Sequence, residues 1–366
     1  MRVGLNLLHL VPGETGGSEI YARRLIPALM ELERDVQPTL FVAHEAADVD
    51  WPRGAEVVRL PIRARSRVAR VVAEQMLLPA AARRSNVDLL HNLFTTGPTL
   101  LGIPQVTTIL DVIYKRFPKT HAGWRARGMN LLVPLAAKRS RRVLTLSRAA
   151  KEDIIRFLGV PADRVDVTYL GPGMRDDVEP VPEDELRQQL DLGTGPVVLT
   201  VSAKRPHKNL ERLIDAFGRL STEPVPVLVI SGYSTPFEAE LRQRAGERVR
   251  FAGWVDDATL EGLYRTAVCL VFPSLAEGFG LPVLEAMRRA LPVVCSDATS
   301  LPEVAGDAAI YFEPTDTSAI TASLERVLRD SQLRKQLSAA GQEQAKKFSW
   351  TETARATLQS YERALA

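Results

Sequence analysis

The chain has 366 residues, 45% hydrophobic and 25% charged, which is too long for one ordinary core and suits two globular domains. It contains no run of about 18 apolar residues, so no membrane-spanning helix is expected. The net charge of +3 conceals an asymmetry, because residues 1–170 carry 25 Lys and Arg against 16 Asp and Glu, whereas the remainder carries a charge of −6; the basic part favours an anionic partner.

The first part of the chain alternates short apolar runs with helical patterns. A strand predicted over 3–10 lacks the cleavage site of a signal peptide. It leads through a glycine-rich turn at 13–17 into a helix predicted over 18–32. The further predicted strands are 39–43, 87–91, 105–110, 142–146 and 166–169, and the further predicted helices are 66–83, 124–138 and 148–158.

Residues 173–191 combine prolines and glycines with acidic residues, which is typical of an interdomain linker. A second alternation follows, with predicted strands 197–201, 225–231, 249–251, 268–272, 293–296 and 309–312 and predicted helices 209–220, 237–244, 257–266, 281–289 and 316–329. Such alternation predicts parallel sheets covered on both faces, whose ligands bind beyond the carboxyl ends of the strands. Cys269 and Cys295 lie in apolar runs and are predicted to be buried thiols, so a reducing cytoplasm is the expected compartment.

The segment Glu-Gly-Phe-Gly-Leu-Pro-Val-Leu-Glu at 277–285 follows a predicted strand and opens a helix. Pro282 suits the first helical turn, where its missing N–H costs nothing. The amides of Phe279, Gly280 and Leu281 then lie at a helix N-terminus, where anions bind and where glycine lets a diphosphate approach the backbone.

Glu277 precedes this helix, and Glu285 lies about one turn into it. Two carboxylates so placed could hold hydroxyl groups on either side of a bound phosphate, one on a sugar and one on a ribose. A pair of surface glutamates beside a turn is the alternative, because a motif counts only in its structural context.

A basic loop follows another predicted strand. Ser-Ala-Lys-Arg-Pro-His-Lys-Asn at 202–209 places Lys204, Arg205 and Lys208 at the carboxyl end of that strand. Cations at this position offset the charge of a departing diphosphate. A solvated basic loop is the alternative.

Other motifs carry less information. Gly16 and Gly17 permit close approach of a ligand to the backbone, but their spacing differs from the dinucleotide motif G-x-G-x-x-G, so an NAD site is disfavoured. Asp48 and Asp50 have the D-x-D form of some metal sites but are predicted to lie in a solvated turn. The histidines lack the spacing of metal ligands, and no metal is expected.

The stretch 63–84 is rich in arginine and predicts a basic amphipathic helix. Such a helix could lie on an anionic membrane, or it could present an Arg-rich face to solvent. No base-reading motif accompanies it, so no nucleic-acid partner is expected.

Taken together, these segments resemble the retaining GT-B glycosyltransferases of family four, and the spacing of Glu277 and Glu285 is similar to that family's E-x7-E signature. Further matches occur in order along the chain, at Leu146-Ser147, Tyr169-Leu170-Gly171-Pro172-Gly173, Pro206-His207-Lys208-Asn209, Phe251-Ala252-Gly253-Trp254-Val255 and Ser300-Leu301-Pro302-Glu303-Val304. The resemblance implies an α/β GT-B fold of two Rossmann-like, doubly wound parallel-sheet domains that face a central cleft. The implied parts are an acceptor domain over 1–172, a linker over 173–191, a nucleotide-sugar donor domain over 192–349, and a helix at about 350–366 that packs back on the first domain.

The resemblance also implies roles for individual residues. Glu277 binds hydroxyl groups of the donor sugar, Glu285 binds the ribose, and Lys208 contacts the diphosphate. The other implied donor-binding residues are Arg205, Phe279, Gly280 and Leu281 for the diphosphate, Trp254 and Val255 for the base, and Gly16 and Gly17 for the phosphate from the opposite domain.

Two positions depart from the family's pattern. Leu110 stands where the family usually has a histidine beside the donor sugar, just before Asp111, which is a candidate for orienting the substrate. Ala203 stands where the family often has an arginine, and Lys204 or Arg205 is expected to supply that charge from a shifted position.

The implied reaction is a retaining, metal-independent transfer of a hexose, of the mannose or glucose type, from a GDP- or UDP-linked donor. The implied acceptor is a hydroxyl group of a glycan or a lipid-linked molecule. No cofactor beyond this co-substrate is expected, and the expected location is cytoplasmic. A peripheral contact with the anionic inner face of the membrane stays open as an option. Two alternatives stay open: a nucleotide-sugar-binding protein with weak or lost turnover, suggested by Leu110, and another GT-B enzyme such as a phosphorylase.

Overall fold

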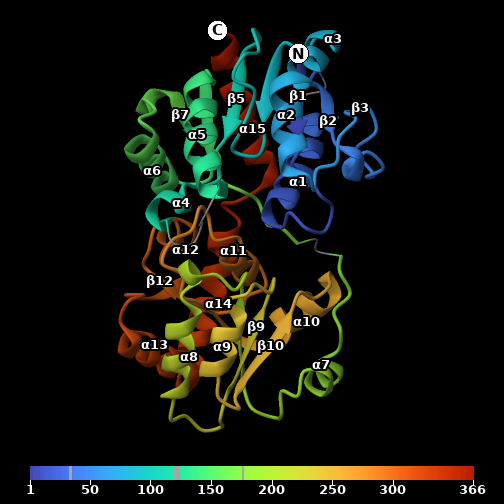
Figure 1. Ribbon diagram of the computed structural model, residues 1–366. Helices are drawn as coiled ribbons and strands as arrows, with labels where there is room; N and C mark the ends of the chain where they lie inside the picture. The colour runs from blue at the N-terminus through green and yellow to red at the C-terminus, as the bar shows by residue number, and fades with distance from the viewer. Residues whose placement is uncertain (33–34, 119–123, 175–176) are drawn as a thin grey trace. The chain divides into compact units, whose positions relative to one another are not determined.

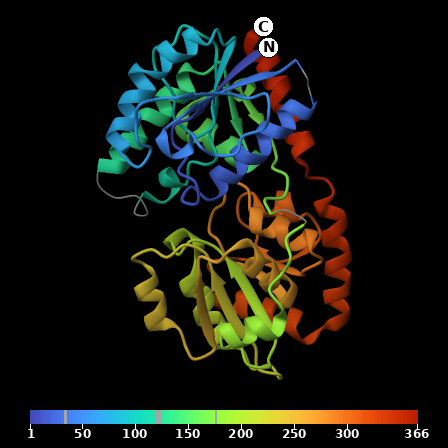
Figure 2. The same cartoon turned by 90° about the vertical axis from the view of Figure 1, so that its right-hand side faces the viewer.

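The computed structural model describes residues 1–32, 35–118, 124–174 and 177–366 (Figure 1). The chain divides into two compact units, one comprising Met1–Gly173 with Phe348–Ala366 and the other Met174–Lys347. Each unit is a sheet of parallel strands with helices packed around it (Figures 1 and 2). The predicted fold class, two parallel-sheet α/β domains, is confirmed.

The first unit contains a seven-stranded sheet in the order β3-β2-β1-β4-β5-β6-β7. Its strands are β1 (Arg2–Leu7), β2 (Gln37–Val42), β3 (Glu56–Arg59), β4 (Leu89–Asn92), β5 (Gln105–Thr108), β6 (Arg142–Thr145) and β7 (Val165–Val167). β1 lies between β2 and β4, with Leu5 opposite Leu40 and His91. β3 was not predicted, because this edge strand is mostly exposed and begins and ends with charged residues instead of forming an apolar run.

The helices of the first unit are α1 (Gly17–Leu32), α2 (Arg67–Met76), α3 (Leu78–Arg84), α4 (Ile113–Arg116), α5 (Trp124–Arg139), α6 (Arg148–Leu158) and α15 (Trp350–Leu365). The prediction of one helix over 66–83 is wrong, because α2 and α3 are separate helices that meet at Leu77. Pro79 is the cause: it has no N–H to donate to the carbonyl of Gln75, so the hydrogen-bond ladder of α2 cannot continue through it.

Helix α15 ends the chain but belongs to the first unit, where it lies against α1 and the strands β5, β6 and β7. The Tyr361 hydroxyl lies 2.7 Å from Nδ1 of the buried His91. Trp350 Nε1–H donates to the carbonyl of Pro172 at 2.7 Å. These polar contacts, one buried and one partly buried, fix the helix along the sheet in addition to its apolar packing.

The second unit contains a six-stranded sheet in the order β10-β9-β8-β11-β12-β13. Its strands are β8 (Val197–Val201), β9 (Val227–Ser231), β10 (Val249–Gly253), β11 (Ala267–Phe272), β12 (Val293–Ser296) and β13 (Ala309–Phe312). Its helices are α7 (Glu183–Gln189), α8 (Leu210–Gly218), α9 (Glu238–Arg244), α10 (Asp257–Thr266), α11 (Leu281–Arg288), α12 (Leu301–Ala305), α13 (Thr317–Arg329) and α14 (Ser331–Ala345). Cys269 and Cys295 are buried free thiols in this sheet, as predicted.

The acidic segment that the sequence marked as a linker is partly helical. From Met174 onward it belongs to the second unit, and it contains α7, which packs against α10. Three acidic residues, Glu183, Asp184 and Glu185, occupy the first turn of α7. Negative charge at a helix N-terminus is stabilising, so the acidic composition has a local structural role there.

Candidate functional site

Two loops follow neighbouring strands at the centre of the second sheet. β8 and β11 pair directly, with Leu199 opposite Leu270, so the segments that follow them leave the same edge of the sheet. Lys208 Nζ, after β8, lies 2.6 Å from Oε1 of Glu277, after β11, and these side chains are 16% and 10% exposed. Burial strengthens such an ion pair compared with one on the surface. The structure thus brings together the two segments that the sequence singled out.

The backbone around Glu277 is held by neighbouring loops. Its N–H donates to Oγ1 of Thr299 at 2.9 Å. The Ser300 hydroxyl donates to the carbonyls of Glu277 and Phe279, at 3.1 and 2.8 Å. The Leu275 N–H donates to the carbonyl of His207 at 2.8 Å, which ties this loop to the basic loop. The carboxylate is therefore placed on a fixed backbone before any ligand arrives.

Helix α11 begins without a side-chain cap. Gly280 precedes it with φ of +105°, a conformation that favours glycine. A Cβ at this position would lie 2.6 Å from Cδ2 of Leu301, so no larger residue fits without a shift. An uncapped helix N-terminus with backbone amides beside a glycine is suited to bind an anionic group.

Glu285 lies inside the protein, with 4% of its surface exposed. The Tyr264 hydroxyl donates to Oε2 at 2.9 Å, and the Met174 N–H donates to Oε1 at 3.2 Å. Burial raises the pKa of the Glu285 carboxyl above its ordinary value. Each carboxylate oxygen accepts one bond from the protein and keeps a second lone pair, so a ligand hydroxyl remains an acceptable further donor.

The three cations of the basic loop have different environments. Lys204 is fully buried, and its ammonium donates to the carbonyl of Gly232; burial lowers its pKa to about 8. Arg205 is exposed, whereas Lys208 pairs with Glu277. The Lys204 ammonium holds the loop after β9. Of the two residues expected to supply the charge missing at position 203, Arg205 is therefore the exposed one.

An aromatic pair follows β9 and β10. Trp254 is 60% exposed, and its ring stacks on that of Tyr233, with ring centres 4.2 Å apart and planes 18° apart. Val255 beside it is half-buried. Sequence reasoning did not single out Tyr233, and its only signal is its place directly after the strand that ends at Ser231. The same carboxyl edge of the sheet thus presents a flat aromatic surface.

The remaining predicted residues lie in the first unit. Gly16 has φ of +55°, and Gly17 begins α1, where a Cβ would meet no atom within 4 Å. Oδ1 of Asp111 accepts the N–H of Ile113 at 2.9 Å, at the start of α4. These residues follow β1 and β5 respectively, at the ligand-binding edge of their own sheet.

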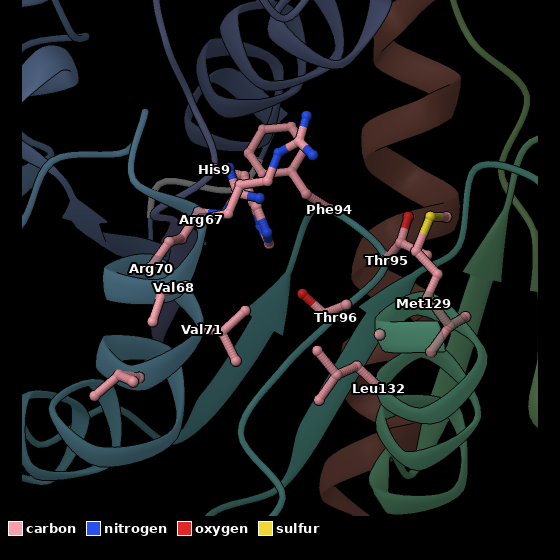
Figure 3. A pocket seen from close by; sticks show the side chains of 13 residues that line it. His9, Arg67, Val68, Arg70, Val71, Phe94, Thr95, Thr96, Met129 and Leu132 are labelled. Carbon is pink, nitrogen blue, oxygen red and sulfur yellow. The ribbon is translucent and has the colours of Figure 1, made fainter. Parts of the chain in front are cut away.

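The first unit also contains a pocket of about 470 Å³ that the sequence did not indicate (Figure 3). Its lining comes from four separate segments: His9 after β1, residues of α2, the loop after β4, and residues of α5. The residues are His9, Arg67, Val68, Arg70, Val71, Val72, Phe94, Thr95, Thr96, Gly128, Met129, Leu132 and Val133. Most are apolar. Those on α2 belong to the basic stretch 63–84, but only the folded chain brings the four segments together.

Features that could indicate a metal site or a membrane span are the last to be compared with the sequence. Asp48 and Asp50 are exposed in a turn, as predicted. Within the described ranges, no three His, Cys, Asp or Glu side chains cluster in a way that could hold a metal ion. None of the described helices is both long and apolar enough to cross a membrane.

Comparison with protein families gives two matches that together cover most of the chain. Residues 182–344 match the model of the glycosyl transferases group 1, and residues 15–171 match that of glycosyltransferase family 4. Both matched ranges contain segments that the geometry points to: the Lys208–Glu277 pair lies in the first range, and Gly16 and Gly17 lie in the second.

Individual proteins agree with these matches. The O-antigen chain mannosyltransferase B of Escherichia coli is 35% identical over 269 residues, which are 70% of this chain and 69% of that protein. The serotype-specific mannosyltransferase WbdA of Escherichia coli is 31% identical over 62% of this chain, but this match spans only 29% of that longer protein. The structure of sucrose-phosphate synthase from Thermosynechococcus elongatus superposes with a TM-score of 0.78 at 21% identity, covering 99% of this chain and 98% of that one, and shows the same fold. The chain therefore belongs to the group 1 glycosyltransferases and has the GT-B fold.

Proposed function

We propose that this protein is a retaining hexosyltransferase that moves a mannose-type sugar from a nucleoside diphosphate donor to a hydroxyl group. The observation that carries the proposal is the Lys208–Glu277 ion pair of 2.6 Å beside the uncapped N-terminus of α11. Family membership and the mannosyltransferase relatives support hexosyl transfer from a nucleotide sugar. The choice of mannose rests on those relatives alone, and a glucose-type sugar is the second option.

The diphosphate is assigned to the edge formed by α11 and the basic loop. Backbone amides of Phe279, Gly280 and Leu281 face a bound anion with the positive end of the helix dipole behind them. Lys208 and the exposed Arg205 add positive charge from the other loop. These groups stabilise the charge that develops on the leaving diphosphate, so the protein's own cations can perform the role that a metal ion has in other transferases.

The sugar and the nucleoside are assigned to residues on either side of the diphosphate. Glu277 accepts hydrogen bonds from the sugar hydroxyls, and Lys208 moves toward the phosphate as the donor enters. Buried Glu285 accepts a bond from the ribose. The base, in GDP or UDP, lies near Trp254 and Val255, where the exposed indole offers a surface for stacking.

The proposed chemistry needs no protein nucleophile. The bond between the anomeric carbon and the leaving phosphate oxygen breaks, and the acceptor oxygen bonds to the same face of the sugar. The proton of the acceptor hydroxyl passes to the departing phosphate oxygen. By the resemblance, Gly16 and Gly17 are assigned to the phosphate, and Asp111 is assigned to orienting the reacting groups.

The decisive experiment measures both binding and stereochemistry. GDP-mannose, UDP-glucose and the corresponding ADP-sugar are compared by thermal shift, because a ligand that binds the folded state raises its stability. Slow hydrolysis of α-linked GDP-mannose is then followed by NMR of the anomeric proton. We expect the α anomer of free mannose to appear first. Appearance of the β anomer first, or the absence of any nucleotide-sugar shift, contradicts the proposal.

Leu110 favours a second candidate function, a protein that binds the nucleotide sugar and turns it over weakly or not at all. The residue is half-buried just before Asp111, and it cannot donate a hydrogen bond to a sugar. A Leu110→His variant separates the two functions. Unchanged donor affinity with turnover raised about tenfold or more supports the weak-turnover candidate, whereas measurable turnover in the natural protein that the variant does not increase supports the transferase.

We also propose a peripheral contact between the first unit and the anionic cytoplasmic face of a membrane. On α2, Val68, Val72 and Met76 are 67%, 53% and 71% exposed, and Arg63 and Arg67 are exposed nearby. Apolar and cationic side chains combined on one helix favour an anionic lipid surface. Flotation with liposomes tests this contact: binding to anionic but not to neutral liposomes at low salt is expected, and no binding to either removes it.

A further inference from the structure

We propose that another pocket of the first unit, of about 400 Å³, is a saccharide site that holds a hexose unit of a glycan away from the reacting edge. The pocket is lined by Arg23, Pro27, Asp50, Trp51, Pro52 and Arg53. The capacity to bind a saccharide follows from these residues alone. The identification of that saccharide as part of the acceptor glycan rests on the proposed transferase function.

The pocket lies beside α1, apart from the edge where the strands of the sheet end. Its walls are α1 and the loop 47–55, which leads back from the end of β2 to the start of β3. Pro27 is ten residues beyond Gly17, the first residue of α1, which is about 15 Å along the helix axis. A Cβ at Gly54 in the same loop would lie 3.3 Å from Cε of Met30, near the end of α1. A ligand bound here therefore leaves the residues of the ligand-binding edge free.

Trp51 provides a fixed aromatic wall. Its Nε1–H donates to the carbonyl of Ala46 at 3.1 Å, so the protein itself occupies the one hydrogen-bond donor of the indole. The residue is half-buried, and the guanidinium carbon of Arg23 lies 6.0 Å from the ring centre, beyond the roughly 3.5–4 Å of a stacking contact. Pro27 and Pro52 add rigid apolar surface beside the ring. The apolar C–H face of a sugar ring fits such a wall, because tryptophan offers a large contact area at a low cost in conformational entropy.

Charged groups of both signs surround this ring. Asp50 and Arg53 are exposed, and neither side chain has a hydrogen bond or an ion pair with another of the described residues. Arg23 binds Glu19 through Nε at 2.8 Å, which leaves its two terminal amino groups available. The pocket thus offers one carboxylate that accepts hydrogen bonds and two guanidinium groups that donate them.

This combination of groups selects a saccharide over other classes of ligand. A sugar hydroxyl both donates and accepts, so two adjacent hydroxyl groups can bond to Asp50 and to an arginine at once. A hydrocarbon chain would leave the three charged groups of the pocket without partners. A phosphate would be attracted by the arginines but repelled by Asp50. A saccharide is the ligand that uses the aromatic ring and both signs of charge.

A saccharide site apart from the reacting edge gives a glycan acceptor a second point of attachment. When one part of a chain is bound, the effective concentration of its other parts near the protein rises, so the overall affinity exceeds that of either site alone. Acceptors long enough to reach both places should therefore have a lower KM than short ones. The pocket thus predicts a preference for long glycans.

The binding test uses the full-length protein without donor and two soluble probes, an α-linked mannohexaose and hexaethylene glycol. An NMR titration measures the affinity of each probe. Hexaethylene glycol is a flexible chain without adjacent hydroxyl groups, so mannohexaose is expected to bind at least about tenfold more tightly. Equal affinities overturn the inference, because apolar contact alone would then account for the binding.

Matched variants locate the bound saccharide. Trp51→Ala is expected to weaken mannohexaose binding at least about tenfold, and Trp51→Phe, which keeps a flat ring, by no more than about threefold. Asp50→Asn is expected to weaken it about fivefold, whereas Asp48→Asn, at an exposed position outside the pocket lining, leaves it unchanged. The aspartate pair decides the question if Trp51→Ala does not fold. Equal affinities of the two aspartate variants, or mannohexaose binding that survives Trp51→Ala, overturn the inference.

Transfer assays separate this inference from the transferase function. The natural protein is expected to have a KM for mannohexaose at least about fivefold below that for methyl α-mannoside. Trp51→Ala should remove this difference and keep the kcat measured with methyl α-mannoside. No difference in the natural protein, or a difference that survives in the variant, overturns the role of the pocket in holding the glycan. A protein that binds mannohexaose through Trp51 but transfers no sugar leaves the saccharide site standing and contradicts the transferase function.

Discussion

The two units place different kinds of chemistry at the carboxyl edges of their sheets. In the second unit the edge is polar, and its ion pair joins two short loops that directly follow β8 and β11. In the first unit the edge opens into a pocket with mostly apolar walls, assembled from four distant segments. The difference teaches that a site built from charged residues in short loops can be recognised as a motif in the sequence. A pocket with apolar walls cannot, because its residues are of the same types as those of any helix that packs on a core.

The largest expected effect comes from breaking the polar edge. Glu277→Ala should reduce kcat/KM by at least about a hundredfold, because it removes a group that orients the donor in the transition state. The variant also leaves the Lys208 ammonium without its partner at 2.6 Å. Nucleotide release from the donor, followed by coupled assay, measures the loss.

The control for this variant is Glu240→Ala on the exposed face of α9, which should retain full activity. A Lys208→Met, Glu277→Ala double variant shows whether the two residues act together. We expect the double variant to lose little more than Glu277→Ala alone, because partners in one ion pair are not additive. Turnover of Glu277→Ala near the natural rate contradicts the donor assignment.

A comparison of two glycines gives the next largest effect. Gly280→Ala should destabilise the second unit by about 1–3 kcal/mol, because φ is positive there and the added methyl group meets Leu301. Gly17→Ala in the first unit should leave stability nearly unchanged, since a Cβ there meets no atom within 4 Å. Thermal unfolding measures both. If Gly17 approaches the phosphate as proposed, its variant should instead weaken donor binding, and equal stability losses at both positions contradict the comparison.

The sequence predicts the strands and the polar loops of the second unit better than it predicts the apolar pocket of the first. β8, β12 and β13 were predicted to the residue, because each is a short, mostly apolar run between turns. The segments 202–209 and 277–285 were both identified because the polar residues within each segment are close neighbours in sequence. The sequence could not separate the roles of Lys204 and Lys208, since only the fold buries the first against Gly232. It also missed the pocket, because Val71 and Leu132 have the residue types of any helix that packs on a core.

Buried carboxyl groups sharpen the contrast between the units. Glu277 faces a lysine, whereas Glu74 in the first unit is 1% exposed and accepts hydrogen bonds from Thr96 and Asn6, at 3.0 and 3.4 Å. Burial raises the pKa of Glu74 from 4.5 to about 7. The folded state therefore binds the Glu74 proton more tightly than the unfolded state does. The resulting contribution to the free energy of unfolding is complete below pH 4.5 and is lost as pH rises through about 7.

Glu74→Gln should consequently flatten the dependence of Tm on pH between about 5 and 8. Over this range the free energy of unfolding of the natural protein should fall by on the order of 2 kcal/mol, whereas that of the variant should not show this fall. Glu240→Gln, at an exposed position, is the control and should follow the natural protein. Parallel Tm curves for the natural protein and Glu74→Gln would mean that Glu74 is ionised throughout and is held by partners stronger than its neutral hydrogen-bond donors.

The smallest expected effect concerns the aromatic pair of the second unit. Trp254→Ala should weaken binding of GDP or UDP about tenfold, because base stacking on an aromatic ring contributes on the order of 1–3 kcal/mol. The ring is 60% exposed and already stacked on Tyr233, so its removal leaves the core intact and Tm nearly constant. Trp254→Phe, which keeps a flat ring, should recover most of the affinity. Unchanged affinity in both variants would contradict stacking on the indole and would assign the base to the backbone beside Val255 alone.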